Sequence, residues 1–595
     1  VAVFLPVGFA SGIVGKMMRE FAFTVAGAVL VSMFVAFTLT PMLASRFLKS
    51  AHAADQGNGA WARFNRAWEK AYGKLEGAYS VLLNLSLKHR WKTLGVAALT
   101  FVLSLGVARF IGAEFAPQND QGLIQVNLKA APGTSLDGTE AIARKLESRL
   151  LELPGVETVF ATVGNWQTQA ANEASITVRM HHGVPSKPIE EKIRPMLADV
   201  AGADAQFQAI SMIGGGGQSA SPIQLKLLGP DLDVLDKLST ELVEEIAAIP
   251  GAVDIRDNLE TGKPEMQVTP RRDLLASTGV PESTLMGSLR ALVAGEKIGD
   301  YSMNGRDREI RLRLEREDRT DAQAIQSLTV SGAQGPMMVA DLAEIDRGLG
   351  PVIINRDNRN RVVTVEGNVT GRSLGEVTAD ITALLEKKQL PQGVTYAFGG
   401  DVQQMQESFG SLLLMMALAI AFIYMVLAAQ FESYIHPFTI MLSLPLAIVG
   451  ALLSLFLFSQ TLSIISIIGI ITLMGLVTKN AILVVEFANQ LREEEGLPML
   501  EAVKKAAPIR LRPILMTTFA MILGMAPMAT GLGAGSETRQ AMGIAIIGGL
   551  ITSTLLTLVV VPVVYTMLDR FTVRGREERR RKREAPEERE PVTIS

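Results

Sequence analysis

The sequence predicts a multi-span α-helical membrane protein that carries a large α+β region, with ferredoxin-like βαβ repeats, outside the bilayer. Two observations support this fold class. The apolar residues of the 595-residue chain are concentrated in long runs, and the mean hydropathy is +0.26. The polar middle of the chain repeats a strand, an amphipathic helix and a Pro-Gly turn. Several domains are therefore expected.

The apolar runs are long enough to cross a bilayer, which takes about 20 residues. Between Ser408 and Gln490 the only Asp, Glu, Lys or Arg residues are Glu432, Lys479 and Glu486, a pattern that excludes a soluble core. The N-terminal residues 1–9 resemble the end of a further span. The seven complete spans are expected at 21–43, 91–112, 409–431, 437–458, 462–487, 513–532 and 541–567.

Basic residues close to the span ends predict the orientation of the chain. The tail that follows the last span is rich in Arg, so its end, and hence the C-terminus, is expected in the cytoplasm, where it contacts anionic lipid rather than nucleic acid. Alternation of the spans then places the basic segment 49–90 inside and residues 113–407 outside the inner membrane. Aromatic residues at helical spacing in 61–79 predict an amphipathic helix in the membrane interface, with a helix that binds a cytosolic partner as the alternative.

Composition excludes several classes of function. The chain contains no Cys, which excludes disulfides, Cys-based zinc sites and Cys nucleophiles. The formal charge of −3 gives no indication of nucleic-acid binding. The chain begins at Val1 inside an apolar run and shows no secretory signal, so we expect it to be part of a longer protein.

The polar middle contains repeated units. Strand, helix and Pro-Gly turn recur in three copies that start near Ile124, Ile223 and Val362. Residues 262–350 separate the second and third copies and have a strand, a helix and a hairpin of their own, which predicts an inserted domain. The spans repeat as well, because the pair Pro6 and Pro41 recurs as Pro527 and Pro562 at an offset of 521 residues. A tandem duplication would explain this repeat, and its first half would then extend upstream of Val1.

Lys479 is the sharpest candidate for a functional residue. It lies deep inside the apolar segment 471–487, where a charge costs several kcal/mol unless it is paired. We expect it to face the interior of the helical bundle and to meet a carboxylate. Glu486 is seven residues away, about 10 Å along a helix, and is too distant for a direct pair. A proton relay would explain a buried Lys that exchanges partners, and a Lys that snorkels to the cytoplasmic surface is the alternative.

Neighbouring polar residues extend this candidate site. Asn480 adjoins Lys479, Thr517 and Thr518 lie in the next span, and Arg510 lies at its cytoplasmic end with Arg512. The alternative for the two Thr residues is a hydroxyl that bonds back to its own helix.

Other motifs indicate no further chemistry. The Gly run 214–217 lacks the Lys-Ser/Thr of a phosphate-binding loop and predicts a connector, so we expect no cofactor and an ion gradient as the energy source. Phe160 and Trp166 flank a loop that could line a substrate cleft, with ordinary packing as the alternative. No metal site is expected, because the Met residues of the polar middle form no M-x-x-M cluster and His181-His182 point to opposite faces of a strand.

Three motifs resemble those of resistance–nodulation–division (RND) efflux permeases of the AcrB/AcrD/AcrF type. Residues 475–487, GLVTKNAILVVEF, are similar to the family's tenth-span motif, and residues 510–518, RLRPILMTT, to its eleventh-span motif. Residues 115–122, FAPQNDQG, follow the family pattern after the seventh span. The resemblance covers the whole chain and implies that Lys479, Thr517 and Arg510 match relay residues, whereas the family's paired aspartates of the fourth span would lie upstream of Val1.

The resemblance also implies a domain plan and a cellular setting. It implies a proton-driven exporter of small amphiphilic drugs, a trimer in the inner membrane of Gram-negative bacteria that works with a periplasmic adaptor and an outer-membrane channel. A heavy-metal exporter and a translocation accessory protein are the alternatives. The implied segments are the end of the fifth span and the sixth span at 1–48, a cytoplasmic linker at 49–90, the seventh span at 91–112, a first porter subdomain at 113–212, a second at 213–260 with 351–400, a docking subdomain at 261–350, spans eight to twelve at 408–571 and a basic tail at 572–595.

Overall fold

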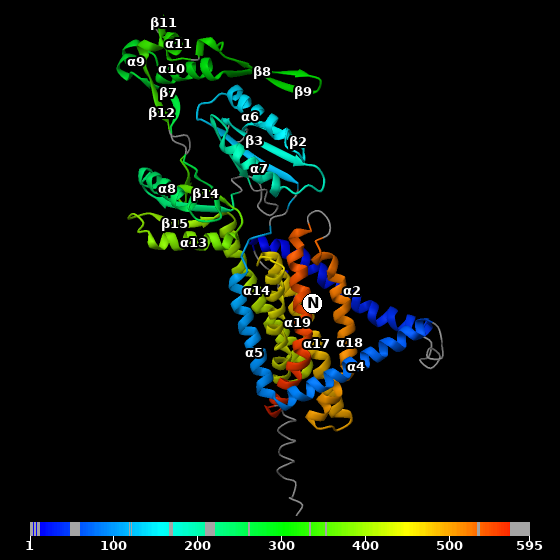
Figure 1. Ribbon diagram of the computed structural model, residues 1–595. Coiled ribbons are helices and arrows are strands. Elements are labelled where there is room, and N and C mark those ends of the chain that lie inside the picture. Colours follow the sequence, from blue (N-terminus) through cyan, green and yellow to red (C-terminus); the bar gives the residue numbers. More distant parts are fainter. Residues whose placement is uncertain are drawn as a thin grey trace, which may run out of the picture.

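The computed structural model consists of a helical bundle from which two sheet-containing units and a smaller third unit extend (Figure 1). It describes residues 4, 8, 12–47, 60–117, 120, 122–165, 170–208, 221–259, 262–319, 321–332, 335–350, 354–531 and 536–571. Most of the opening segment 1–9, the Gly run 214–217 and the basic tail 572–595 lie outside the described residues.

The bundle confirms the predicted number of apolar spans. Seven described helical segments are long and apolar enough to cross a membrane. The span predicted at 437–458 is divided at Leu442 into two helices. The helices are α2 (Gly12–Phe47), α5 (Arg90–Val107), α14 (Gly400–Phe431), α15 (Ile435–Met441) with α16 (Ser443–Leu457), α17 (Ile464–Glu494), α18 (Met499–Ala529) and α19 (Glu537–Leu568).

The linker that follows the first apolar helix forms a helix longer than its amphipathic pattern predicts. Helix α4 (Ala60–Lys88) has 29 residues, because its inner side packs on the bundle beyond residue 79. The Tyr79 hydroxyl donates a 2.8 Å hydrogen bond to the carbonyl oxygen of Leu558, and the Arg512 guanidinium lies 5.3 Å from the centre of the Tyr72 ring. Val81 and Leu85 remain exposed on the opposite side. The helix therefore has a packed side and an apolar exposed side, as an interfacial helix requires.

The first sheet unit follows the seventh span. Its four strands have the antiparallel order β2-β3-β1-β4, and alternate residues of β1 are buried against two helices. This unit contains β1 (Leu123–Ala130), α6 (Leu136–Leu151), β2 (Val156–Asn165), β3 (Ala170–Met180), α7 (Lys187–Ala198) and β4 (Ala203–Gln208).

In the second sheet unit, four of the five strands repeat this topology in the order β6-β14-β5-β15, and the short β13 also pairs with β14. The copies near Ile223 and Val362 are two halves of one sheet, and β3, α7 and β4 form a further half in the first unit that the Pro-Gly pattern misses. The unit contains β5 (Ile223–Gly229), α8 (Leu232–Ala247), β6 (Ala252–Asp257), β13 (Arg356–Asp357), β14 (Asn360–Val369), α13 (Leu374–Lys387) and β15 (Thr395–Gly399).

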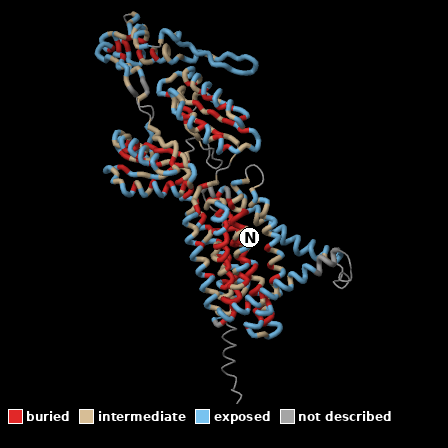
Figure 2. Tube along the Cα trace, in the orientation of Figure 1, coloured by how far each residue is buried: buried red, intermediate tan, exposed pale blue. Residues whose placement is uncertain are grey.

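The insertion in the second unit folds as a small body on a two-stranded stalk (Figure 1). Strands β7 (Lys263–Pro270) and β12 (Ala343–Gly350) pair along their whole length and form the stalk. The hairpin of β8 (Glu296–Met303) and β9 (Arg306–Leu312) projects from this body and is exposed along nearly its whole length (Figure 2). The remaining elements are α9 (Arg272–Thr278), α10 (Glu282–Leu289), η2 (Arg290–Ala294), η3 (Glu317–Arg319), α11 (Ala322–Ser327), β10 (Thr329–Gly332), β11 (Gly335–Met338) and α12 (Val339–Leu342).

A short strap joins the bundle to the sheet units. After η1 (Ala108–Phe110), the amide of Glu114 donates a 3.1 Å hydrogen bond to the carbonyl of Leu462, at the start of α17. The neighbouring carbonyl of Ala113 accepts a 2.9 Å bond from the amide of Gly375 in α13. Backbone hydrogen bonds therefore connect the membrane helices directly to the second sheet unit.

Candidate functional site in the helical bundle

The candidate site is built on α17, which carries charged and amide side chains inside an apolar span. The helix starts at a capping box in which Ser463 and Ser466 each accept a hydrogen bond from the other's backbone amide. From there it runs for 31 residues through the bundle, next to α18 and α19 in the structure (Figure 1). Its length places Lys479 near its middle, about 23 Å from its first residue.

Lys479 does not face the interior of the bundle that the described residues form. Its side chain is exposed, whereas the adjacent Thr478 and Asn480 are buried. Successive residues are 100° apart around a helix, so Asn480 can face α19 while Lys479 points away from it. Among the described residues, no carboxylate lies within ion-pair distance of Lys479.

Asn480 belongs to a buried polar network that connects three helices. Its Nδ2 donates a 3.3 Å hydrogen bond to Oγ1 of Thr554 on α19, and this hydroxyl lies 3.2 Å from Oγ1 of Thr518 on α18. All three residues are at most 5% exposed. Oδ1 of Asn480 is buried and has no hydrogen-bond partner among the described residues. The network therefore orients the amide and leaves one strong acceptor available.

Thr517 and Arg510, the other predicted site residues, lie outside this network. The Thr517 hydroxyl donates a 3.0 Å hydrogen bond to the carbonyl of Ile514 in its own helix, which is the alternative stated for the Thr pair. Arg510 is half-buried, with its guanidinium 4.3 Å from the centre of the Phe487 ring on α17. That geometry is a cation–π contact. The structure thus brings Arg510 to α17 at residue 487, where the predicted span ends.

Lys479 and Glu486 lie on the same side of α17, because seven residues are nearly two full turns. Both side chains are exposed, so we call them the polar stripe of α17. Exposed apolar residues on α18, among them Met516 and Leu523, are typical of a surface that lipid or further helices cover. A bilayer does not solvate two charges, so the polar stripe requires a polar partner.

Thr554 is the site residue that the sequence analysis missed. It follows Ser553 and precedes Thr557 in an otherwise apolar stretch of α19, and all three are at most 3% exposed. Hydroxyl residues at positions i, i+1 and i+4 of a transmembrane helix are a usable signal for an interhelical contact. The sequence alone does not show which helix they face.

The predicted substrate residues of the first sheet unit are not brought together in the described part of the chain. Phe160 on β2 is 66% exposed and paired with Thr177 of β3. Trp166 lies outside the described residues.

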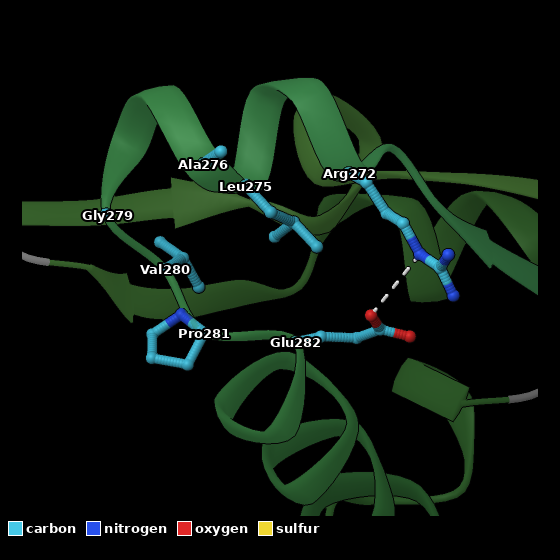
Figure 3. Close-up of a pocket in the computed structure, with 7 residues that line it drawn as sticks. All are labelled: Arg272, Leu275, Ala276, Gly279, Val280, Pro281 and Glu282. Carbon is cyan, nitrogen blue, oxygen red and sulfur yellow. Dashed lines mark ion pairs between the residues drawn. The ribbon is translucent and has the colours of Figure 1, made fainter.

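A pocket of about 400 Å³ lies in the inserted body, between α9 and α10 (Figure 3). An ion pair of 3.6 Å between Arg272 Nε and Glu282 Oε2 crosses its rim, and both side chains are largely exposed. Gly279 ends α9 in the left-handed conformation and so shapes the turn beneath the pocket. The pocket is far from α17 (Figure 1) and carries no reactive group. Among the described residues, no cluster of three His, Asp or Glu side chains could hold a metal ion.

The described residues combine seven apolar helices, polar side chains on α17 and two sheet units. This combination is found in a known protein family. The model of the AcrB/AcrD/AcrF family matches residues 1–569. The chain belongs to this family of RND efflux permeases. The family is one of efflux transporters, and the seven apolar helices of the described residues agree with an inner-membrane protein.

Solved structures agree with this assignment. Two crystal forms of a heavy metal efflux pump superpose on the chain with a TM-score of 0.79 at 25% sequence identity. They cover 96% of this chain, whereas the chain covers 57% and 56% of theirs. The chain thus spans little more than half the length of the pumps that it resembles.

Proposed function

We propose that the chain is the C-terminal part of a proton-driven efflux permease in which Lys479 takes part in the transmembrane proton relay. The observation that carries the proposal is the polar stripe of α17, a Lys and a Glu exposed on a helix of an otherwise apolar span. Such charges inside a membrane are costly and are retained where they move ions or protons.

The chemistry of the relay follows from the charge of Lys479. A carboxylate on a helix that packs against the polar stripe would pair with the Lys479 ammonium. A proton that enters from outside would neutralise this carboxylate, and the ammonium would then move to another acceptor. Deprotonation toward the cytoplasm would restore the pair. Asn480, Thr517 and Arg510 would accompany this cycle, Asn480 through its available Oδ1 and Arg510 from the cytoplasmic side.

We infer an orientation and an assembly from the family. Residues 113–407 would lie in the periplasm, with two ferredoxin-like porter subdomains and the inserted body as the docking subdomain, and the C-terminus would be cytoplasmic. The complete permease would be a trimer that works with a periplasmic adaptor and an outer-membrane channel. The protruding β8–β9 hairpin supports a docking role, because its exposed Tyr301, Ile310 and Leu312 lie on one face and form an apolar surface.

We propose small amphiphilic drugs as the cargo, with no bound cofactor. The support is the location of the Met residues, since Met180, Met266, Met286 and Met337 pack in or against apolar cores rather than in a soft-metal site. A heavy-metal cargo is the second candidate, because the two matched structures are described as a heavy metal efflux pump.

The test is Lys479→Ala in the intact gene, expressed in an efflux-deficient Gram-negative host. Drug resistance should fall to the level of the empty vector at unchanged expression. Lys504→Ala is the matched control, because Lys504 is also exposed but lies in the first turns of α18, outside the apolar stretch. Unchanged drug resistance in Lys479→Ala would refute the relay assignment. Loss of copper or silver resistance alone would select the metal cargo, and no change of either resistance in a gene deletion would favour an accessory protein.

A further inference from the structure

The two sheet units meet through polar groups rather than through a shared core. Each has its own cluster of buried apolar residues, and no residue belongs to both clusters (Figure 2). Hydrophobic burial therefore stabilises each unit by itself and contributes little to the contact between them. Small polar interfaces of this kind permit relative motion unless specific bonds hold them.

The contact is centred on Asp254, which lies at an irregularity in the second sheet. The pairing of β6 with β14 shifts its register between Glu366 and Asn368, and Asp254 has a φ of +55°. A left-handed backbone at a residue other than Gly is uncommon and strained, although Asp and Asn tolerate it best. The sheet accepts this conformation, which turns the Asp254 carboxylate toward the first unit.

The carboxylate is bonded from both units. Arg194 on α7 of the first unit places Nη1 2.5 Å from Asp254 Oδ1. Asn368 on β14 donates through Nδ2 to Asp254 Oδ2 at 3.0 Å and also to the carbonyl of Phe207 at 2.9 Å. The Arg194 guanidinium lies 4.9 Å from the centre of the Phe207 ring. We name these four residues, Arg194, Phe207, Asp254 and Asn368, the unit clasp.

We propose that the unit clasp is a releasable latch that holds the two sheet units together, and that Glu190 makes its release dependent on pH. The clasp joins charge-assisted hydrogen bonds to a strained backbone, so opening it exchanges strong bonds for hydration and relief of strain. No apolar core must be broken at the same time. This inference concerns a movement within the chain and does not depend on the cargo or on Lys479.

Glu190 lies beside the clasp on α7, one helical turn before Arg194. Burial raises the pKa of the Glu190 carboxyl, Arg194 and Lys187 oppose the shift, and Asp120 and Asp254 add to it. The charged groups that face Glu190 are thus Lys187 and Arg194 on its own helix, Asp120 before β1 and Asp254 on β6. Once ionised, Glu190 competes with Asp254 for Arg194, so the clasp weakens as the pH rises through the pKa of Glu190 and tightens in acid.

The latch can be tested by measuring the distance between the units in the complete protein. The chain contains no Cys, so Ser148→Cys in α6 and Lys237→Cys in α8 provide two exposed positions for spin labels. Double electron–electron resonance then measures the distance between the two labels. Asp254→Asn removes the charge but retains the tolerance for a left-handed backbone. We expect a second, longer distance to appear, with at least a threefold increase in the open population.

Two further variants separate the latch from a folding defect. Arg194→Gln breaks the clasp from the other unit and should give the same longer distance, and the double variant should open no further than either single one. Asp204→Asn is the matched control, because Asp204 also reaches across to the second unit but lies 4.0 Å from Arg256 Nη1 and is 59% exposed. Its distances should equal those of the parent.

The pH response has its own control. The open population of the parent should increase as the pH is raised through the pKa of Glu190, and Glu190→Gln should remove this increase and remain closed. Identical distance distributions in the parent, Asp254→Asn and Arg194→Gln would overturn the latch. An unchanged pH response in Glu190→Gln would overturn the role of Glu190. The latch itself would still be tested by the distances measured in Asp254→Asn and Arg194→Gln.

Discussion

At the scale of single residues, the Thr554 hydroxyl connects side chains from two other helices. It accepts from Asn480 and lies beside Thr518, so three helices meet at one buried oxygen. Thr554→Val retains the shape of the side chain and removes both contacts. Because buried polar groups that lose their partners cost about 1–3 kcal/mol each, we expect the free energy of unfolding to fall by roughly that amount. Thermal unfolding in detergent measures the change.

Thr472→Val is the matched control for this prediction. Thr472 is equally buried on α17, but its hydroxyl donates only to the carbonyl of Ile468 in the same helix, at 2.9 Å. That substitution should change the melting temperature little, because no group on another helix loses a partner. Equal losses in Thr472→Val and Thr554→Val would contradict the role of the interhelical network.

Glu114 in the strap gives a prediction on pH. Burial raises the pKa of its carboxyl, while the hydrogen bond to Thr461 and the charge of Lys187 oppose the shift. The folded state therefore prefers the protonated form, and this contribution to stability is lost as the pH rises through the raised pKa. Glu114→Gln should raise the melting temperature at pH 7 by about 1–3 °C and leave it unchanged below about pH 4. A higher melting temperature of the variant at both pH values would show that titration is not the cause.

At the scale of elements, α16 and α19 approach closely because small residues face one another. A Cβ atom on Gly548 would strike Ser454, and one on Gly450 would strike the backbone of Gly548. Ser454 also donates a 3.1 Å hydrogen bond to the carbonyl of Ile544. Gly548→Ala should therefore destabilise the bundle by about 1–3 kcal/mol through overpacking.

Gly410→Ala distinguishes this packing effect from the general effect of Gly in a helix. A Cβ atom on Gly410 in α14 would meet nothing within 4 Å. Because Ala is the better helix former, this variant should be neutral or slightly stabilising. Thermal unfolding of Gly548→Ala and Gly410→Ala should give changes in melting temperature that are opposite in sign or clearly different in size.

At the scale of the whole molecule, the seven spans and the basic loops predict which parts face each side of the membrane. A membrane-impermeant maleimide should label Ser148→Cys in the first sheet unit in intact spheroplasts. Lys504→Cys near the start of α18 should react only after the membrane is permeabilised. Labelling of Lys504→Cys in intact spheroplasts would reverse the proposed orientation.

Much of the fold could be predicted from local patterns. Apolar runs of about 20 residues located the seven spans, because a bilayer imposes that length on a helix. Hydrophobic alternation in β1 and β5 predicted strands that are buried on one face, and both strands show that pattern. The motif around Lys479 was sufficient for the family, which the match over residues 1–569 confirms.

The parts that could not be predicted depend on contacts between distant segments. The Pro-Gly turns marked three repeats, and the pairing of β14 with β5 shows that two of them share one sheet. The side of α17 that packs on α19 depends on neighbours, so the exposed position of Lys479 and the choice of Thr518 over Thr517 were not accessible from spacing.

The sequence by itself therefore determined the spans, the alternation of strands and helices and the family, because hydropathy, periodicity and long motifs are local properties of the chain. Only the tertiary structure decided that Asn480, Thr554 and Thr518 meet, and that Arg194 reaches Asp254 in another unit. These contacts join residues that are 36 to 74 positions apart. Their geometry depends on how whole helices and sheets pack, which no single segment specifies.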